Sequence, residues 1–326
     1  VDEIRYKELK KLGEFQAKNI IESNVVEIAR AFYNLVQQEQ LLEVAQSTLK
    51  ISKDRLDKSK VRNELGSASS TDLLNAQVSY NNDKATLLQR QLEVVVSKKN
   101  LNVLLGRNPN ETVEVNQEII IPHLNYDFDS LSKIALEYNS NLIIAKQNRI
   151  IADKDVDINQ SFIYPRLSLN GSYGYNDRVT STNSPRVEGD VLTQSTDGSV
   201  SLNLSFNIFN AFRDDVNLQS SIIQNELQGI ALKKAETELL GNLKEKYETH
   251  LAQKDFIELE EQNVVAAEQN LKLQEERFQT GTTTSLEFRD AQVNLARAQN
   301  ILIVARYQAR ITLLEIQQLL GELKVE

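Results

Sequence analysis

The sequence contains one helical pattern twice, at a spacing of 215 residues. Residues 32–106 align with residues 247–321 without a gap. The matched positions include apolar residues and a turn: Leu42 with Ile257, Leu56 with Leu271, Gly66 with Gly281, and Ser70 with Ser285. Both copies finish on Leu-Leu-Gly, at Gly106 and Gly321. A repeat of this length predicts two copies of one supersecondary unit, which here is a long helical hairpin.

Apolar residues at seven-residue intervals predict the helices of the second hairpin. The first of these helices is expected from about 212 to 278, where one series is Ile257, Val264, Leu271 and Phe278, and a second is Leu259, Ala266 and Leu273. The next helix, from about 286 to 320, repeats the pattern with Leu295, Leu302, Ala309 and Ile316. Two such series on one helix indicate packing partners on two sides.

Proline and glycine mark where the hairpins end. All four prolines fall between residues 109 and 185, so both hairpins are free of helix-breaking rings. Gly106 and Gly321 are predicted to close their helices, because glycine adopts the left-handed conformation of a helix C-terminus at little cost.

The middle of the chain changes from a helical to a strand period. Residues 130–160 are predicted to form one further helix. After Pro165, apolar residues alternate with Ser and Asn in two runs: Leu167, Leu169, Tyr173 and Tyr175, then Val200, Leu202, Leu204, Phe206 and Ile208. This alternation predicts two strands. Each run has about 10 to 12 residues, the length of a tilted strand that crosses a bilayer, and residues 177–198 between them are predicted to be an exposed loop.

Aromatic residues mark both ends of the predicted strands. Those at the ends next to the helices are Phe162, Tyr164, Phe206, Phe209 and Phe212, and those towards the loop are Tyr173 and Tyr175. This placement is typical of two interfacial girdles around an apolar band. A strand pair in a soluble protein shows the same alternation, so alternation alone leaves both environments open.

Two strands cannot close a barrel. In lipid, an open sheet edge leaves backbone groups unsatisfied at several kcal/mol each, so other chains are expected to complete the sheet. The residues expected to face lipid are Leu167, Leu169, Val200, Leu202, Leu204, Phe206 and Ile208. The opposite, polar face is expected to line a wet lumen.

Composition narrows the classes of function. The absence of Cys and the presence of only two His exclude disulfides, thiolate nucleophiles and multi-histidine metal sites. A net charge of −9 without a Lys/Arg-rich window argues against nucleic acid. No phosphate-binding loop or dinucleotide fingerprint is present. We therefore expect a protein that is not an enzyme and has no cofactor and no metal, with His123 and His250 as structural or surface residues.

Several motifs together resemble the TolC-like outer-membrane efflux protein family. They are the duplicated hairpin with its Gly-x-x-x-Ser turn, an acidic residue and Ala (Gly66 to Ala76, Gly281 to Ala291), the Leu-Leu-Gly ends, the Tyr164-Pro165-Arg166-Leu167 strand start, and the strand-to-helix exit from Phe206 to Arg213. Ala211 stands where the family often has Gly, and Asn207 where it often has Pro. The resemblance covers nearly the whole chain.

The resemblance implies a mainly α fold with a β-hairpin. Long antiparallel α-helical coiled-coil hairpins would form a periplasmic α-barrel, and the strands would join a membrane β-barrel completed by trimerisation. The implied divisions are 1–106 as a first, incomplete hairpin repeat, 107–129 as a connecting segment, 130–161 as a helix, 162–211 as the outer-membrane β-hairpin, 212–321 as the second long hairpin, and 322–326 as a tail. Only the second repeat is complete, so we expect a further strand pair and a leader upstream of Val1.

The function implied by the resemblance is a passive exit duct. It would be the outer-membrane channel of a tripartite efflux or type I secretion system in a Gram-negative bacterium. The implied partners are two further copies in a homotrimer, a periplasmic adaptor protein, an inner-membrane pump reached through the adaptor, and outer-membrane lipid. The alternative that stays open is a soluble coiled-coil scaffold or adaptor-like protein whose β-hairpin serves oligomerisation.

The resemblance also assigns residues at the hairpin tips. Glu287 and Asp290 would form acidic rings at a pore constriction, which favours cations. The alternative is that they are helix-start acids that stabilise the positive amino end of a helix. The small tip residues Gly66, Ser70, Gly281 and Ser285 would meet the adaptor.

The resemblance also implies a latch, that is, a contact between the two tips that holds the entrance closed, but the chain has only some of the residues for it. Phe278 and Thr283 stand where similar proteins use a Tyr and an Arg to hold the entrance closed. We therefore expect Asp72 to pair with Arg277 or Arg289 instead, with a simple capping role for Asp72 as the alternative.

Overall fold

The computed structural model describes residues 2–66, 69–115, 118–121, 127–184 and 187–322. In chain order the elements are α1 (Asp2–Glu64), α2 (Ser70–Leu104), α3 (Phe128–Tyr138), α4 (Ser140–Ser161), β1 (Arg166–Ser184), β2 (Val187–Ser205), α5 (Arg213–Thr280) and α6 (Ser285–Leu320). Helices α5 and α6 have approximately the bounds predicted for the second hairpin, and α1 and α2 form the predicted first hairpin.

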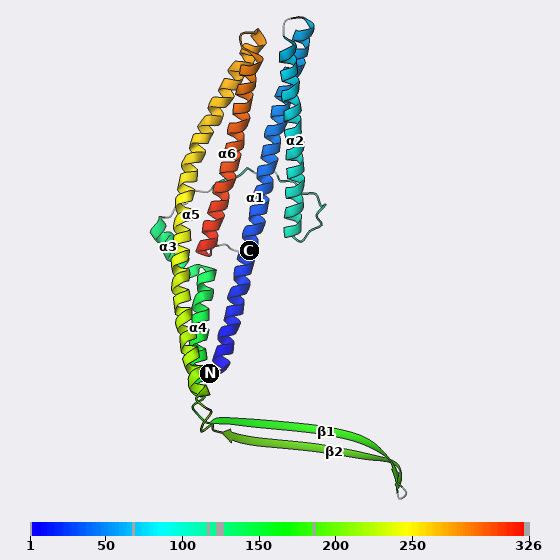
Figure 1. The fold of residues 1–326 in the computed structure, drawn as a ribbon, viewed down its shortest axis with the longest axis vertical. Coiled ribbons are helices and arrows are strands. Elements are labelled where there is room, and N and C mark those ends of the chain that lie inside the picture. The colour runs from blue at the N-terminus through cyan, green and yellow to red at the C-terminus, as the bar shows by residue number, and fades with distance from the viewer. Residues whose placement is uncertain (1, 67–68, 116–117, 122–126, 185–186, 323–326) are drawn as a thin grey trace. The chain divides into compact units, whose positions relative to one another are not determined.

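The chain divides into two compact units. The ribbon unit combines Val1–Leu12 with Ala145–Leu232, and the hairpin unit combines Gly13–Ile144 with Lys233–Glu326. In the hairpin unit, α1 turns back into α2 and α5 turns back into α6, and both turns lie at the same end of the unit (Figure 1).

One of the two predicted seven-residue series of α5 packs in the core of the second hairpin, while Leu259 and Leu273 of the other series are exposed. Along α5 and α6, one cluster of buried residues is Ile257, Leu302, Ala305 and Ala309, and a second, nearer the turn, is Leu271, Phe278, Phe288 and Ala291. In each cluster α6 contributes alanine beside a larger residue, Leu302 or Phe288, and the alanines let the two backbones approach closely. The corresponding cluster of the first hairpin is Leu35, Val94 and Leu101.

The two Leu-Leu-Gly ends close their helices as predicted. Gly106 and Gly321 both have φ of +67°, in the left-handed region that glycine favours. Their surroundings differ. A Cβ at Gly106 would meet no atom within 4 Å, whereas one at Gly321 would lie 2.2 Å from the carbonyl oxygen of Tyr138. Gly321 therefore also permits the close approach of the end of α3.

The prediction of one helix over 130–160 was wrong, because the helix is interrupted at Asn139. This residue is extended, with φ −61° and ψ 121°. Its side-chain oxygen accepts a hydrogen bond from the Leu142 backbone N–H at 2.9 Å, and its amide nitrogen donates to the Leu319 carbonyl at 3.0 Å. Asn139 thus caps α4 and ties the break to the end of α6.

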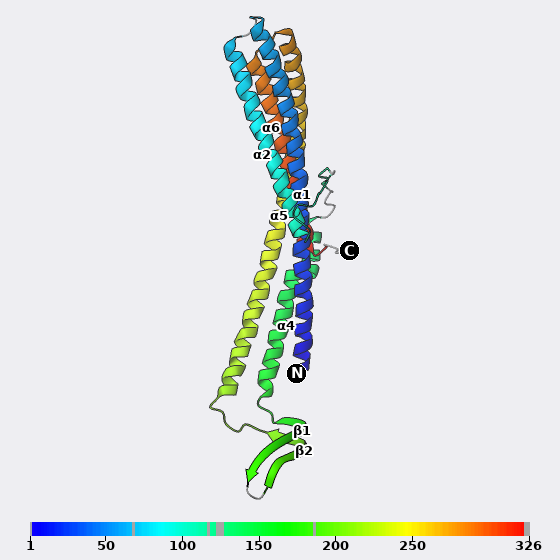
Figure 2. The ribbon, with the colours of Figure 1, turned by 90° about the vertical axis from the view of Figure 1, so that its right-hand side faces the viewer.

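The predicted loop over 177–198 was also wrong, because the strands run through it. β1 and β2 have 19 residues each and pair antiparallel, from Arg166 opposite Ser205 to Ser184 opposite Val187. Figure 2 shows the two strands side by side and curved along their length. The outer part is rich in Thr and Val, which favour strands, and ladder pairing does not require an apolar face. Phe206 and Ile208, predicted within the second strand, follow its last residue.

The pair of strands β1 and β2 is called the ribbon below. Where the chain leaves β2 towards α5, two residues have an unfavourable backbone conformation. Ala211 and Phe212 have φ of 56° and 62°. A left-handed conformation costs a residue other than glycine roughly 1–2 kcal/mol. Ala211 is also the position at which the resemblance expects Gly, so the chain makes this sharp turn without the residue best suited to it.

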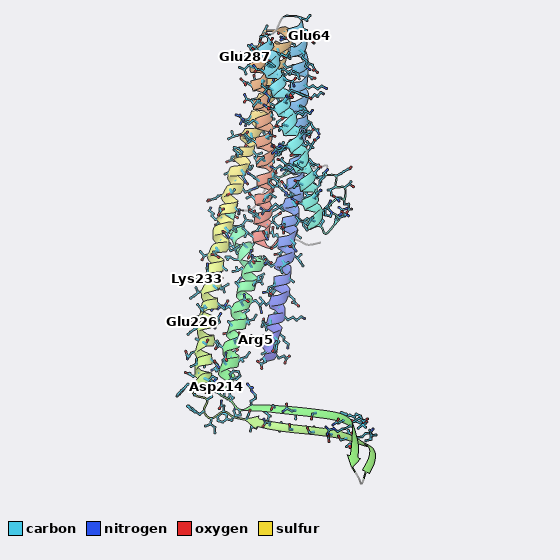
Figure 3. The ribbon with its side chains drawn as sticks, turned by 45° about the vertical axis from the view of Figure 1, so that its right-hand side comes forward. Arg5, Glu64, Asp214, Glu226, Lys233 and Glu287 are labelled. Carbon is cyan, nitrogen blue, oxygen red and sulfur yellow. The ribbon has the colours of Figure 1, made fainter. Side chains whose placement is uncertain are left out.

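Polar contacts hold α4 against the first turns of α1 in the ribbon unit. Gln147 donates to the Glu8 carbonyl at 3.0 Å and to its carboxylate at 2.7 Å. Arg5, labelled in Figure 3, forms an ion pair with Asp155. Among the described helices, none has a stretch apolar and uncharged enough to cross a bilayer.

We predict that Gly321→Ala destabilises the protein more than Gly106→Ala. Both substitutions place a side chain at the same positive φ, but only the first meets a carbonyl oxygen. Thermal unfolding of the two variants measures the difference. Equal melting temperatures would show that Tyr138 moves aside at no cost.

Candidate functional site

The two hairpin turns bring the predicted tip residues to one end of the hairpin unit. Figure 3 labels Glu64 at the end of α1 and Glu287 at the start of α6, and both lie at this end. Gly66 and Gly281 have φ of 71° and 78°, which confirms them as turn-forming residues. Ser70 and Ser285 are the first residues of α2 and α6.

Glu287 takes part in a capping box at the start of α6. The Thr284 hydroxyl accepts a hydrogen bond from the Glu287 backbone N–H at 3.2 Å, and the Glu287 carboxylate accepts one from the Thr284 N–H at 2.9 Å. The Thr283 hydroxyl donates to the same carboxylate at 2.6 Å. The hydrogen bond from Thr283 and those from Thr284 hold the pKa of Glu287 below its usual value.

Asp72 has the equivalent position at the start of α2. The Ser69 hydroxyl accepts from the Asp72 backbone N–H at 3.1 Å and donates to its carboxylate at 2.8 Å. Within the chain, the capping geometry expected as the alternative is therefore present for both acids. Asp290 is exposed one turn further along α6.

The tip contact between hairpins differs from the predicted latch. The Arg62 guanidinium donates to the Phe278 carbonyl at 2.7 Å, and its central carbon lies 4.6 Å from the centroid of the Phe278 ring. Phe278 in turn stacks on Phe288, with centroids 5.3 Å apart. Arg62, on α1, thus joins the first hairpin to the end of α5. Asp72 is paired with neither Arg277 nor Arg289.

Arg289 instead pairs with a carboxylate deeper in the hairpins. Its two terminal nitrogens lie 2.5 and 2.8 Å from the carboxylate oxygens of Asp83, a bidentate pair that joins α6 to α2. The Asp83 side chain is 9% exposed and that of Arg289 19%. Beside the pair, Gln292 donates to the Thr48 carbonyl of α1 at 2.8 Å.

A second guanidinium is buried next to this pair. Arg55 is 3% exposed, its terminal nitrogen donates to the Ser285 carbonyl at 3.4 Å, and its Nε has no partner among the described residues. Burial, and then the charge of Arg289, lowers the pKa of Arg55 to about 10, while the Asp83 carboxylate acts in the opposite direction. Asp83 is therefore the anion that compensates two cations.

Sequence reasoning missed Asp83, although the repeat contains a signal. Asp83 belongs to the seven-residue series of Ala76 and Ser97, both of which are buried. Its counterpart in the second hairpin is Ala298, which is also buried. A carboxylate at a buried position where the other repeat has Ala requires a partner.

The ribbon places its apolar residues on one face, as predicted. Leu167 lies opposite Leu204, and Leu169 opposite Leu202. Their side chains are uncovered, with Leu169 72% exposed and Leu202 68%. On the other face, the hydroxyls of Ser172 and Ser199 lie 2.8 Å apart. The described part of the chain covers neither face.

The described residues contain no cluster of three His, Cys, Asp or Glu side chains that could hold a metal ion. His250 is buried in α5, and its burial lowers its pKa. His123 lies outside the described residues.

The sequence matches the family model described as outer membrane efflux protein over residues 131–322. Among curated proteins, it is 25% identical to outer membrane protein TolC of Escherichia coli over 304 residues. It is 24% identical to the probable efflux pump outer membrane protein TtgC of Pseudomonas putida over 307 residues. These matches cover 92% and 91% of this chain but only 61% and 60% of the two relatives.

Solved structures with the same fold include outer membrane channels. Outer membrane protein VceC from Vibrio cholerae superposes with a TM-score of 0.78 at 19% identity, covering 98% of this chain and 74% of VceC. The MtrE outer membrane channel from Neisseria gonorrhoeae superposes with a TM-score of 0.77 at 14% identity, covering 97% of this chain and 70% of MtrE.

We predict that Asp83→Ala costs more stability than Arg289→Ala. Removing one partner of a buried pair costs about 3–5 kcal/mol. Loss of Asp83 leaves two guanidiniums that repel each other without a carboxylate between their charges, whereas loss of Arg289 leaves Asp83 to interact with Arg55. Denaturant unfolding measures both free energies.

The control for this prediction is Glu238→Ala, which removes an exposed pair with Lys234. Its expected cost is below about 1 kcal/mol. A cost of Asp83→Ala no larger than that of Glu238→Ala would contradict the role of Asp83.

Proposed function

This chain belongs to the outer membrane efflux protein family, and from that membership we propose that it forms part of an outer-membrane channel. The channel is the passive exit component of a tripartite efflux or type I secretion system. It lies in the outer membrane of a Gram-negative bacterium, and the helical hairpins extend into the periplasm. The cargo leaves through it without a chemical step in this protein.

The observation that carries this proposal is the uncovered apolar face of the ribbon. Val200, Leu169 and Leu202 are 81%, 72% and 68% exposed on this face. Contiguous apolar surface of this kind indicates a binding surface. Contact with acyl chains would remove this face from water. The free energy of transfer favours this burial by about 25 cal/mol for each Å² of apolar area. The lipid-facing residues are those predicted from the alternation, with Phe206 and Ile208 just beyond the strand.

The ribbon also supports assembly as a homotrimer. The sheet that the structure describes has two strands, so one edge of β1 and one edge of β2 have no strand beside them within it. In lipid these edges would leave backbone groups unsatisfied. Strands from other copies satisfy them, and rotational symmetry closes the ring.

The tips are the surface for a periplasmic adaptor protein. Gly66 and Gly281 have no atom within 4 Å of a Cβ built on them, so a partner can approach these turns closely. Ser70 and Ser285 follow at the helix starts. An inner-membrane pump, reached through the adaptor, supplies the energy of transport. Within a protomer, Arg62 and the Arg289–Asp83 pair hold the two hairpins together near the tips.

Glu287 and Asp290 form the acidic constriction of the channel. Three copies of each would line a narrow opening with carboxylates, which attract cations and bind divalent ions. The capping role of Glu287 is compatible with this ring, because a capping carboxylate keeps its charge. The lowered pKa of Glu287 keeps that charge at a lower pH than usual.

We predict that Glu287→Gln with Asp290→Asn raises single-channel conductance and weakens block by divalent cations. Gln still accepts the capping hydrogen bond from Thr284, so the start of α6 is retained while the charge is lost. Conductance of the full protein in planar lipid bilayers is the measurement.

The control variant, Glu258→Gln with Glu268→Gln, makes the same charge change at exposed positions of α5. Unchanged conductance and block in the tip variant would contradict the ring. A full protein that gives no channels, and that is recovered in the soluble fraction, would contradict the channel itself and favour the coiled-coil scaffold.

We predict that Gly281→Leu abolishes adaptor-dependent drug resistance and leaves the oligomer intact. The new side chain would project into open space, so its cost within the chain is limited to the positive φ. Gly106→Leu is the matched control, since Gly106 has a similar φ and open surroundings away from the tip. Equal loss of resistance in both variants would assign the effect to folding.

A further inference from the structure

A cleft of about 370 Å³ lies between the two hairpins, next to the Arg289–Asp83 pair. Helices α1, α2 and α6 all contribute to its lining. Its volume lies within the range of about 300–1,000 Å³ that is usual for small-molecule sites. We call this space the arginine cleft, because Arg90, Arg289 and Arg297 are three of its lining residues.

Apolar side chains make up much of the lining of the arginine cleft. Leu41 and Val44 of α1 line it together with Val293 and Ile301 of α6. Leu41 is only 4% exposed, so this part of the lining is held in place by packing. An apolar lining with a few charged groups is typical of sites for small organic molecules.

The charged residues stand at two levels along the cleft. Helices α2 and α6 both run away from the tips, and Asp83 of α2 pairs with Arg289 of α6 (Figure 1). Arg90 is seven residues beyond Asp83, and Arg297 is eight residues beyond Arg289. With a rise of about 1.5 Å per residue, both arginines lie roughly 11 Å further along their helices, at about the same level.

The guanidiniums at this second level are available to a ligand. Arg297 is exposed, and it has no hydrogen bond or ion pair with any described residue. Arg90 pairs with Glu93 at 2.6 Å, but the two side chains are 29% and 32% exposed. Ion pairs that solvent reaches contribute little to stability, so an anion in the cleft can compete with Glu93 for Arg90.

The buried charges next to the cleft leave a further surplus cation. Arg55 and Arg289 share the single carboxylate of Asp83, and the Nε of Arg55 has no partner among the described residues. The chain as a whole carries a net charge of −9. A local surplus of guanidinium in such an acidic chain favours an anion at this place.

We propose that the arginine cleft binds a small organic carboxylate, with the anionic group between Arg90 and Arg297 and the apolar body against Leu41 and Val293. The planar guanidinium donates two parallel hydrogen bonds to a carboxylate, which gives both affinity and orientation. A ligand bound in this way joins α2 to α6. The inference uses only residues of the hairpin unit and does not rest on the proposed function.

Titration with an aromatic carboxylate tests the proposal. The probe is 2-naphthoate, added to the full protein in lipid nanodiscs, with empty nanodiscs as the blank in isothermal titration calorimetry. The matched neutral probe is 2-naphthalenemethanol, which has the same rings without the charge. We expect 2-naphthoate to bind at one site per chain and the neutral probe to bind at least tenfold more weakly, because it lacks the charge-assisted hydrogen bonds.

Arg297→Gln is the variant that identifies the site. The side chain of Arg297 is exposed and unpaired within the described residues, so its loss leaves the contact between the hairpins intact. We expect the dissociation constant of 2-naphthoate to rise at least tenfold. Arg297→Lys should cause a smaller rise, because it keeps the charge and loses the two parallel donors. Lys84→Gln, an equal charge change at an exposed position of α2, is the control and should leave the constant unchanged.

Thermal unfolding gives a second readout, because a ligand that binds only the folded state stabilises it. Saturating 2-naphthoate should raise the melting temperature of the unchanged protein and of Lys84→Gln more than that of Arg297→Gln. Absence of saturable 2-naphthoate binding, equal affinity for the two probes, or equal effects of the Arg297→Gln and Lys84→Gln variants would overturn the site. A protein that conducts without binding 2-naphthoate would retain the channel and lose only the site, and one that binds it without forming channels would do the reverse.

Discussion

Helix α5 has apolar residues on two sides, and its own hairpin can bury only one of them. Ile257, Leu271 and Phe278 are covered by α6, while Leu259 is 59% exposed and Leu273 48%. The ribbon also leaves an apolar face uncovered by the described residues, since Leu169 is 72% exposed and Leu202 68%. The hydrophobic effect favours the removal of both surfaces from water, and the proposed partners, further copies of the chain and lipid, would cover them.

The hairpins could be predicted from sequence because their determinants are local. Seven-residue spacing fixes which side of each helix is buried, and Gly66, Gly281, Gly106 and Gly321 fix where the helices turn or end. The break at Asn139 could not be found in this way, because its amide bonds to Leu319 from a distant part of the chain. Strand length was underestimated for a different reason. Regular alternation of apolar and polar residues fades in the sequence beyond Asn176, although the backbone ladder continues.

The same distinction applies to the candidate site. The capping box is local, and the spacing Thr284-x-x-Glu287 is its usual signature. The Arg289–Asp83 pair depends on how α2 and α6 lie together, so spacing could not identify it. The signal in the sequence is a mismatch between the repeats, because Asp83 occupies the position at which the second repeat has the buried Ala298. Within one chain the expected latch is not formed, because the Asp72 carboxylate accepts a hydrogen bond from Ser69 and Arg289 is paired with Asp83.

The buried charges near the tips follow from the way the two hairpins of one chain meet. The connection through one chain keeps the hairpins close during folding, so the cost of burying Asp83, Arg289 and Arg55 is met once and with fixed geometry. At the equivalent positions of the other repeat stand Ala298, Leu74 and Asn270, none of which is charged. The duplicated hairpin has therefore diverged at these positions, and the charges occur where carboxylate and guanidinium lie within reach of one another in a single chain.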